Sequence, residues 1–414
     1  MRRPTVAMAL YGDPTNDGRV QREAASLAAA GYDVLVCALD IRDPDAIERV
    51  HGVRYMGYRP AISRVLPGTR SPFHADDPGT SRPVAGGRLG WAAGYLANLR
   101  AWGKWAVKTG GTPSVWHVND LPGLLGLWIG GLPRHAPFVY DSHELYVESG
   151  SAARMPAIAR GLLTRFERRL IRRAAGVLTV NRGIAQELAN RYGVEPVVVL
   201  NCPSYVDVSR PGKLRSTLGL GDETIILYHG LVGANRGIET TIEALRRLPS
   251  SVVFVVLGDG SLVPYVRELR EEPALRGRLY WHPSVPQSEL LSWVVDADVG
   301  SVLIAPVELS FVLSTPNKLF ECMTAGVPVV ASDFPTMREI VLGEAIGYVC
   351  DPMDPRRVAE VIDRLLTDRA ALRAMAQRGQ NAARRAYNWE TQAAALVGLY
   401  GSVVAGQPVT WNDS

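Results

Sequence analysis

Two residues three positions apart, Lys318 and Glu321, have side chains suited to a ligand that carries both phosphate and ribose. They lie in STPNKLFECMTAGVPVV, residues 314–330, and would share one face of a helix with Asn317. An ammonium group can neutralise a phosphate, and a carboxylate can accept hydrogen bonds from both hydroxyls of a ribose. Only four of the 45 basic residues are lysines, so Lys318 is unusual in this chain.

The residues around this pair predict a capped helix that leads into a strand. Thr315 can cap the helix, Pro316 suits its first position, and Gly326 suits its end. The first three backbone amides would be free, and the helix dipole would favour an anion such as a pyrophosphate there. These amides belong to Asn317, Lys318 and Leu319. The alternative is a capped helix on which Lys318 and Glu321 form only a minor surface pair.

A second group of polar residues follows two predicted strands in the first half of the chain, in WHVNDLPGLL and VYDSHELYVES. These residues are His117, Asn119, Asp120, Asp141, His143 and Glu144. Parallel sheets bind ligands just past such strand ends, although a histidine can equally cap a helix or satisfy a core. The earlier turn YGDPTNDG adds Gly18, which would let a backbone approach a ligand closely or simply close a strand-to-helix turn.

Short β-branched runs alternate with longer helical patterns, which is typical of βαβ units around a parallel sheet. The first series is TVAMAL, DVLVCAL, SVWHV, FVYDS, GVLTV and PVVVL; the second is TIILYHG, SVVFVVLG, LYWHP, DVGSVLI and VPVVAS. We therefore predict an α/β protein with two doubly wound domains, residues 1–203 and 204–385, and a C-terminal helix and tail, residues 386–414. Two such domains facing each other would form a cleft.

Composition excludes several classes of protein. The 414 residues are about twice the usual size of one domain, and the formal net charge of +4 is too small for a protein that mainly binds nucleic acid. The four cysteines match neither a zinc spacing nor a disulfide framework, which fits a reducing cytoplasm. The first apolar run is too short for a signal peptide, so we expect a cytoplasmic protein.

The segment at residues 314–330 closely resembles a PNKLFE variant of the donor-binding signature of glycosyltransferase family 4. The resemblance covers nearly the whole chain in the expected order. It includes DGRVQREA, YHGLVGANRGIETTIEAL, GDGS, HPSVPQSELLSWVVDADVGSVLIAP and YNWETQAAALVGLY. It implies the GT-B fold, in which an N-terminal acceptor domain and a C-terminal nucleotide-sugar domain are both Rossmann-like. The last segment would be the helix that crosses back to the first domain.

The resemblance also assigns roles to individual residues. Glu321 matches the glutamate that holds the donor ribose, and Arg236 matches a basic residue that binds the diphosphate. His143 matches a histidine that contacts the donor sugar and the leaving group, which makes it the expected catalytic residue. The donor site would also include Gly230, Asn317, Lys318 and Leu319, and the acceptor side or cleft would include Gly18, His117, Asp120 and Glu144.

Two positions depart from the family pattern. Many members have an arginine directly after the glycine matching Gly230, whereas this chain has Leu231. The usual signature also has a first glutamate eight residues before the second, and that position is Leu313. The first departure removes one contact to the donor phosphate, so Arg236, together with Lys318, would carry more of the phosphate binding. The second leaves the identity and pose of the sugar open.

The implied activity is transfer of a sugar, with retention, from a UDP-, GDP- or dTDP-linked donor to a hydroxyl of a small-molecule, glycan or lipid-linked acceptor. The leaving phosphate would take the acceptor proton, so no paired carboxylates, cofactor or metal are required. The motif Asp296-Ala-Asp298 is expected to be a solvated turn. Two alternatives are a nucleotide-sugar 2-epimerase, which shares the two-domain fold, and a non-catalytic binding protein, which the two departures would permit.

One predicted helix raises the question of contact with a membrane. It contains aromatic residues among basic ones, namely Trp91, Tyr95, Trp102 and Trp105 beside Arg88, Arg100, Lys104 and Lys108. Such a helix could lie at the inner face of a membrane or contact a lipid-linked acceptor. Aromatic residues at this spacing more often pack into a core.

Overall fold

The computed structural model describes residues 3–41, 47, 50–59, 87–208 and 212–406. The chain divides into two compact units. Unit 1 comprises Met1–Leu200 and Ala393–Ser414, and unit 2 comprises Asn201–Gln392. The first stretch of unit 1 thus ends at Leu200 rather than the expected position 203, and unit 2 ends at Gln392 rather than 385.

The described residues of unit 1 form a seven-stranded parallel sheet in the order β3-β2-β1-β4-β5-β6-β7. The strands are β1 (Thr5–Leu10), β2 (Asp33–Ala38), β3 (Val53–Gly57), β4 (Val115–Asn119), β5 (Phe138–Ser142), β6 (Gly176–Thr179) and β7 (Val197–Val198). The strand order reverses between β1 and β4, which is where doubly wound sheets bind ligands. The apolar runs in β1 and β4 are buried because helices cover both faces of the sheet.

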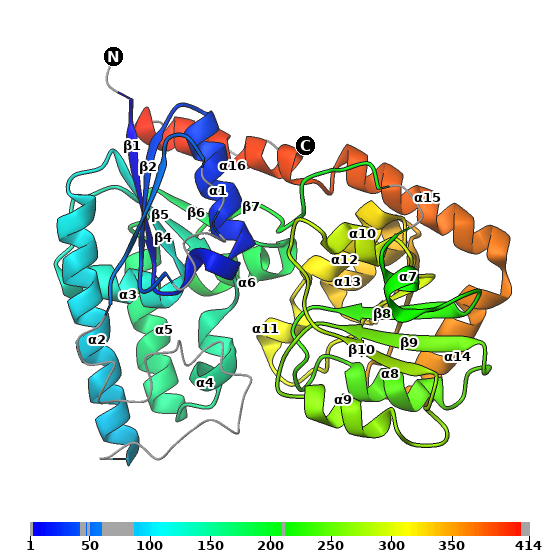
Figure 1. Cartoon of the computed structure of the whole chain (residues 1–414). Coiled ribbons are helices and arrows are strands. Elements are labelled where there is room, and N and C mark those ends of the chain that lie inside the picture. The colour runs from blue at the N-terminus through cyan, green and yellow to red at the C-terminus, as the bar shows by residue number, and fades with distance from the viewer. Residues whose placement is uncertain (1–2, 42–46, 48–49, 60–86, 209–211, 407–414) are drawn as a thin grey trace. The chain divides into compact units, whose positions relative to one another are not determined.

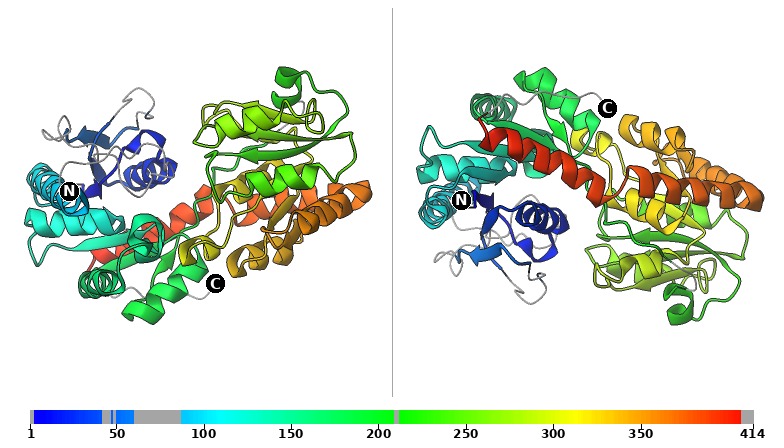
Figure 2. Two further views of the ribbon diagram at one scale, coloured as in Figure 1. Left: turned by 90° about the horizontal axis from the view of Figure 1, so that it is seen from below. Right: turned by 90° about the horizontal axis from the view of Figure 1, so that it is seen from above.

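Helices of unit 1 lie on both faces of this sheet. They are α1 (Gly18–Ala29), α2 (Gly87–Gly110), α3 (Asp120–Gly130), α4 (Gly150–Ala153), α5 (Ala157–Ile171), α6 (Arg182–Tyr192) and α16 (Trp389–Val404), with short 3-10 turns η1 (Pro14–Asn16) and η4 (Tyr146–Glu148). Figure 1 shows α2 and α3 on one face and α1 on the other. Figure 2 shows α16, in red, running along unit 1, where Leu399 lies so close to Gly176 that a Cβ at Gly176 would be 2.8 Å from it.

The aromatic helix with the membrane-like pattern is α2, and its aromatic side packs inside unit 1. Trp102 is fully buried, and Trp105 is partly buried. A Cβ on Gly103 would lie 1.8 Å from the carbonyl oxygen of Gly126, so α2 and α3 approach too closely for any other residue there. Packing in the core therefore explains Trp102 and Trp105, whereas the side chains of Arg88 and Trp91 lie outside the described part of the chain. None of the helices in the described part of the chain has both the length and the hydropathy that a membrane span needs.

In unit 2, the described residues form a six-stranded parallel sheet in the order β10-β9-β8-β11-β12-β13. The strands are β8 (Thr224–His229), β9 (Val252–Leu257), β10 (Leu279–His282), β11 (Val299–Val302), β12 (Val329–Ser332) and β13 (Gly347–Cys350). The helices are α7 (Leu214–Leu218), α8 (Ile238–Leu245), α9 (Val263–Leu269), α10 (Leu290–Val294), α11 (Leu309–Val312), α12 (Asn317–Ala325), α13 (Pro335–Gly343), α14 (Pro355–Thr367) and α15 (Arg369–Arg385). Both units are thus doubly wound α/β domains, as predicted.

The turns after β8 and β9 come together at the carboxyl end of this sheet. A Cβ on Gly258 would lie 1.9 Å from the carbonyl oxygen of Gly230, so the GDG turn after β9 requires glycine. Gly230 itself has φ +111°, a conformation that side chains strongly disfavour. These two glycines let the turns after β8 and β9 pack together, while Tyr228 and His229 at the end of β8 contact Lys318 and Glu321 of α12.

Candidate functional site

The start of α12 lies one residue later than predicted. Pro316 occupies the capping position and Asn317 begins the helix, so neither Thr315 nor Pro316 has its expected place. The Leu319 amide is not free, because it donates a hydrogen bond of 2.9 Å to the Pro316 carbonyl. The amides of Asn317 and Lys318 make no hydrogen bond with any residue that the structure describes. Two of the three predicted amides therefore remain available to an anion.

The Lys318 ammonium is almost enclosed by protein. The residue is 9% exposed, and its Nζ lies 3.6 Å from the centroid of the Tyr228 ring. Burial, followed by repulsion from Arg236, lowers the pKa of Lys318 to about 7. The aromatic face favours the charged form of Lys318, but a buried charge without a counter-ion is costly.

The Glu321 carboxylate is held by two protein donors. His229 Nε2 lies 2.8 Å from Oε2, and the Gln287 amide donates to Oε1 over 3.1 Å. A carboxylate oxygen can accept more than one hydrogen bond, so bonding to His229 and Gln287 does not by itself prevent Glu321 from accepting ribose hydroxyls. The two donors fix the plane of the carboxylate before any ligand arrives.

Arg236, the residue predicted to bind the diphosphate, lies in the loop between β8 and α8. Its guanidinium is partly buried, with Cζ 5.3 Å from the centroid of the Phe311 ring, and it is close enough to Lys318 to repel its charge. Gly237 follows with φ +71°, and a Cβ there would lie 2.3 Å from Leu303 Cβ. Glycine is therefore required at this position for the loop to fold against β11. At the position of the missing arginine, Leu231 is 46% exposed.

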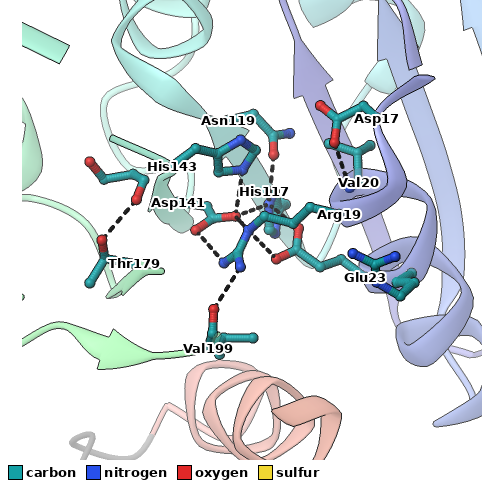
Figure 3. Close-up of polar contacts among 12 residues, drawn as sticks. Asp17, Arg19, Val20, Glu23, His117, Asn119, Asp141, His143, Thr179 and Val199 are labelled. Carbon is teal, nitrogen blue, oxygen red and sulfur yellow. Dashed lines mark hydrogen bonds and ion pairs between the residues drawn. The ribbon is translucent and has the colours of Figure 1, made fainter. Parts of the chain in front are cut away.

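In unit 1 the polar residues converge on Asp141, at the end of β5. Arg19, from the first turn of α1, donates to both carboxylate oxygens over 2.9 and 3.0 Å, and its Nη1 donates to the Val199 carbonyl (Figure 3). His143 Nε2 lies 2.9 Å from Asp141 Oδ2. Burial alone would raise the pKa of Asp141, but Arg19 and His143 hold it well below its usual range.

His143 lies between two carboxylates just past the end of β5. Asp120 accepts its backbone amide over 2.9 Å, and Asp120 Oδ2 lies 3.5 Å from its Nδ1. Burial lowers the pKa of His143, but Asp120 and Asp141 outweigh that effect and raise it to about 10. His143 is consequently an imidazolium at neutral pH. Asp120 has φ +54°, a strained conformation of the kind found at functional sites.

His117 differs from its predicted place. It is the third residue of β4 rather than a strand end, it is fully buried, and its Nδ1 lies 2.6 Å from the Tyr400 hydroxyl of α16. Its Nε2 lies 3.3 Å from the Glu23 carboxylate. His117 thus joins helices α1 and α16 inside the core, and it does not open onto a ligand.

Three buried residues of this network, Glu23, His117 and Asp141, could each offer a ligand atom to a metal ion. However, the Arg19 guanidinium lies 3.0 Å from a Glu23 oxygen and 2.9 Å from an Asp141 oxygen. It supplies the positive charge that these carboxylates need. Burial raises the pKa of Glu23 to about 7, even though Arg19 opposes this.

The remaining predicted residues have simpler surroundings. Gly18 begins α1, where Asp17 caps the helix by accepting the Val20 amide, and a Cβ at Gly18 would meet only the mobile end of Arg22. Close packing within unit 1 therefore does not require glycine there. Glu144 is partly buried, and its carbonyl accepts the Ser142 hydroxyl.

The two aspartates of the DxD sequence bind protein groups. Asp296 accepts the backbone amides of Gly212 and Arg215. Asp298 accepts the Ile225 amide and pairs with Arg215 and Arg369. They tie α7 and α15 to the sheet, and Asp296 is buried, so the expected solvated turn is wrong and a role in the fold explains these residues.

Models of known domain families match both halves of the chain. Residues 18–203 match the model "Glycosyl transferase 4-like domain", and residues 211–384 match "Glycosyl transferases group 1". The two domains are glycosyltransferase domains.

Curated relatives of these glycosyltransferase domains are also named as glycosyltransferases. D-inositol 3-phosphate glycosyltransferase of Xylanimonas cellulosilytica is 32% identical over 258 residues, which are 58% of this chain and 60% of the relative. Alpha-D-kanosaminyltransferase of Streptomyces kanamyceticus is 27% identical over 251 residues, 57% and 63% of the two chains. The matches thus span about three-fifths of these relatives.

Solved structures share the GT-B fold over nearly the whole chain. Sucrose-phosphate synthase from Thermosynechococcus elongatus has a TM-score of 0.70 at 21% identity, covering 98% of this chain and 100% of that one. Anabaena HepE in complex with UDP-glucose has a TM-score of 0.69 at 16% identity, covering 97% and 100%. At these identities the likeness shows the fold.

Sequence reasoning about the glycosyltransferase domains missed three residues that hold the predicted site residues. His229 and Gln287 hold Glu321, and Arg19 holds Asp141. His229 ends a strand beside a glycine turn, which is a usable signal, and Arg19 opens a helix after the first strand. No local pattern distinguishes Gln287, because its partner is 34 residues away.

Proposed function

We propose that this chain transfers a glycosyl unit, with retention, from a nucleotide diphosphate sugar to a hydroxyl of an acceptor, giving an α-linkage from an α-linked donor. The observation that carries the proposal is the trio at the carboxyl end of the unit 2 sheet. A buried ammonium, Lys318, a guanidinium, Arg236, and an oriented carboxylate, Glu321, provide complementary groups for a diphosphate and a ribose. UDP, GDP and dTDP are the candidate nucleotides.

In this proposal the protein works mainly by positioning and electrostatic stabilisation. Lys318, Arg236 and the two free amides of α12 bind the diphosphate, and Glu321 holds the ribose. These cations supply the positive charge that the departing diphosphate needs, so we propose that no metal is required. His143, charged at neutral pH, acts at the donor sugar and the leaving group.

The acceptor carries a hydroxyl nucleophile, whose proton passes to the leaving phosphate oxygen. We propose that unit 1 binds it, with Asp120, Glu144 and the loop at Gly18 as candidate contacts. D-inositol 3-phosphate and 2-deoxystreptamine, which appear in the names of two relatives, are the first acceptors to test.

The experiment is a panel of UDP-, GDP- and dTDP-sugars with the full chain, read as thermal stabilisation and as nucleotide release with and without acceptor. We expect one nucleotide to stabilise the protein, and its release to depend on acceptor. Conversion of the donor without acceptor would favour the 2-epimerase. Binding without turnover across a broad acceptor panel would favour a binding protein, and the absence of stabilisation by every nucleotide would overturn the proposal.

A further inference from the structure

The ammonium group of Lys318 has no anionic partner in unit 2. Nine-tenths of the residue is buried, and it makes no hydrogen bond or ion pair with any residue in the described part of the chain. Nζ instead lies over the face of the Tyr228 ring, whose hydroxyl donates to the Leu231 carbonyl.

Ionisable groups near Lys318 come from three segments. They are Tyr228 and His229 of β8, Arg236 of the following loop, and Glu321 and Cys322 of α12. The adjoining segments LLSWV of α10 and VGSV of β11 carry no ionisable side chain, and none from α15 is among the groups that act on the charge of Lys318.

Glu321 is the one acid among these neighbours, and its carboxylate is already bonded to His229 and Gln287. It favours the charged form of Lys318, but burial and Arg236 together outweigh it. The pKa of Lys318 therefore falls to about 7, and near neutral pH a large share of the molecules carry an uncharged amine there. A doubly charged diphosphate placed beside Arg236 and Lys318 would raise the pKa of Lys318 again, because it supplies the missing counter-ion.

We propose that the donor diphosphate binds together with one proton, which Lys318 takes from solvent, so that the ligand itself completes the charge of its binding site. The inference rests on the proposed function, since it assigns the diphosphate to this site. In the free protein Nζ is an amine in part of the population; in the complex it is an ammonium paired with phosphate oxygens. The proton comes from the buffer, and no other group changes its bonding.

The pH dependence of affinity follows from this linkage. Below pH 7 Lys318 is already charged in the free protein, so affinity is at its highest. Above pH 7 each molecule that binds must first gain a proton, and affinity falls by about tenfold per pH unit until the raised pKa of the complex is reached. The chain lacks an arginine at Leu231, so no permanently charged residue at that position would mask the effect.

Isothermal titration calorimetry tests the proposal on the full chain. The probe is the nucleoside diphosphate that stabilises the protein most, titrated at pH 8 in two buffers with different ionisation enthalpies. We expect uptake of close to one proton per nucleotide at pH 8 and tighter binding at pH 7. Binding with no proton uptake at pH 8 would overturn this inference and leave the proposed function intact. No binding of any nucleotide would overturn both.

Substitutions test whether Lys318 is the residue that takes up the proton on binding. Lys318→Arg keeps a permanent charge, so it should bind at pH 8 without uptake and with a flat pH profile. Lys318→Met should bind at least tenfold more weakly at pH 7, also without uptake. Lys108→Met, at an exposed lysine of α2, should match the wild type. If either Lys318 variant folds, by circular dichroism, and still takes up a full proton, the assignment is wrong.

Discussion

The charged clusters of the two units differ in how their charges are balanced. In unit 1, Asp141 accepts hydrogen bonds from Arg19 and His143, and His143 lies between two carboxylates. In unit 2, Lys318 faces an aromatic ring and has no acid paired with it among the described residues. In unit 1 the cations are paired with acids, although the buried Glu23 oxygens accept no hydrogen bond from the described residues. In unit 2 the buried lysine lacks an anion.

This difference separates Arg19, whose charge is paired within its own unit, from Lys318, whose charge is not. A buried charge costs several kcal/mol unless it is paired, so an ion pair formed within a domain can be kept for the fold or for orientation alone. A buried cation without a counter-ion is harder to explain by stability, because an apolar side chain would cost less there. Lys318 is therefore better explained by binding, and Arg19 by structure.

The largest effect expected from this comparison is the loss of stability in Arg19→Met. Removing the guanidinium leaves Asp141 with His143 as its remaining close cation and breaks the buried pair between Arg19 and Glu23, and breaking a buried pair in this way costs about 3–5 kcal/mol. Chemical denaturation followed by circular dichroism measures the loss. Arg338→Met is the matched control, because its pair with Asp333 is exposed and worth about 0–1 kcal/mol. Equal losses in both variants would remove the distinction between the clusters.

A smaller effect, on binding rather than folding, is expected for Glu321→Ala. Hydrogen bonds to a charged group are worth about 1.5–3 kcal/mol each, so loss of the ribose contacts should weaken nucleotide affinity about 10- to 100-fold. Calorimetry measures the affinity, and Glu360→Ala, at an exposed residue paired with Arg357, is the control. If Glu321→Ala instead destabilises the fold as much as Arg19→Met while leaving affinity unchanged, Glu321 is a structural residue.

The sequence predicts more of the fold than of the site. Continuous apolar runs between helical patterns predict most strands, because parallel strands are buried on both faces. The edge strands β3 (VRYMG) and β13 (GYVC) are partly exposed and lack such a run. Spacing on one helix predicts that Lys318 and Glu321 are close together. It does not predict that His229 and Gln287 hold Glu321, since those contacts join residues 92 and 34 positions apart. The interior place of His117 depends on Tyr400, 283 residues away.

A third expected effect concerns pH, and it sharpens the contrast between His143 and Lys318. The pKa of His143 is raised to about 10 in the folded protein, whereas it is about 6.5 in the unfolded chain. The charged imidazole therefore stabilises unit 1 fully below pH 6.5, and this stabilisation is lost as the pH rises through 10. The difference in melting temperature between the wild type and His143→Asn should therefore narrow from pH 6.5 to 10, by about 2–4 °C for each kcal/mol lost. Nucleotide affinity of the variant should keep the wild-type pH dependence, because that dependence belongs to Lys318. A melting-temperature difference that stays constant over this range would mean that His143 is not charged by Asp120 and Asp141.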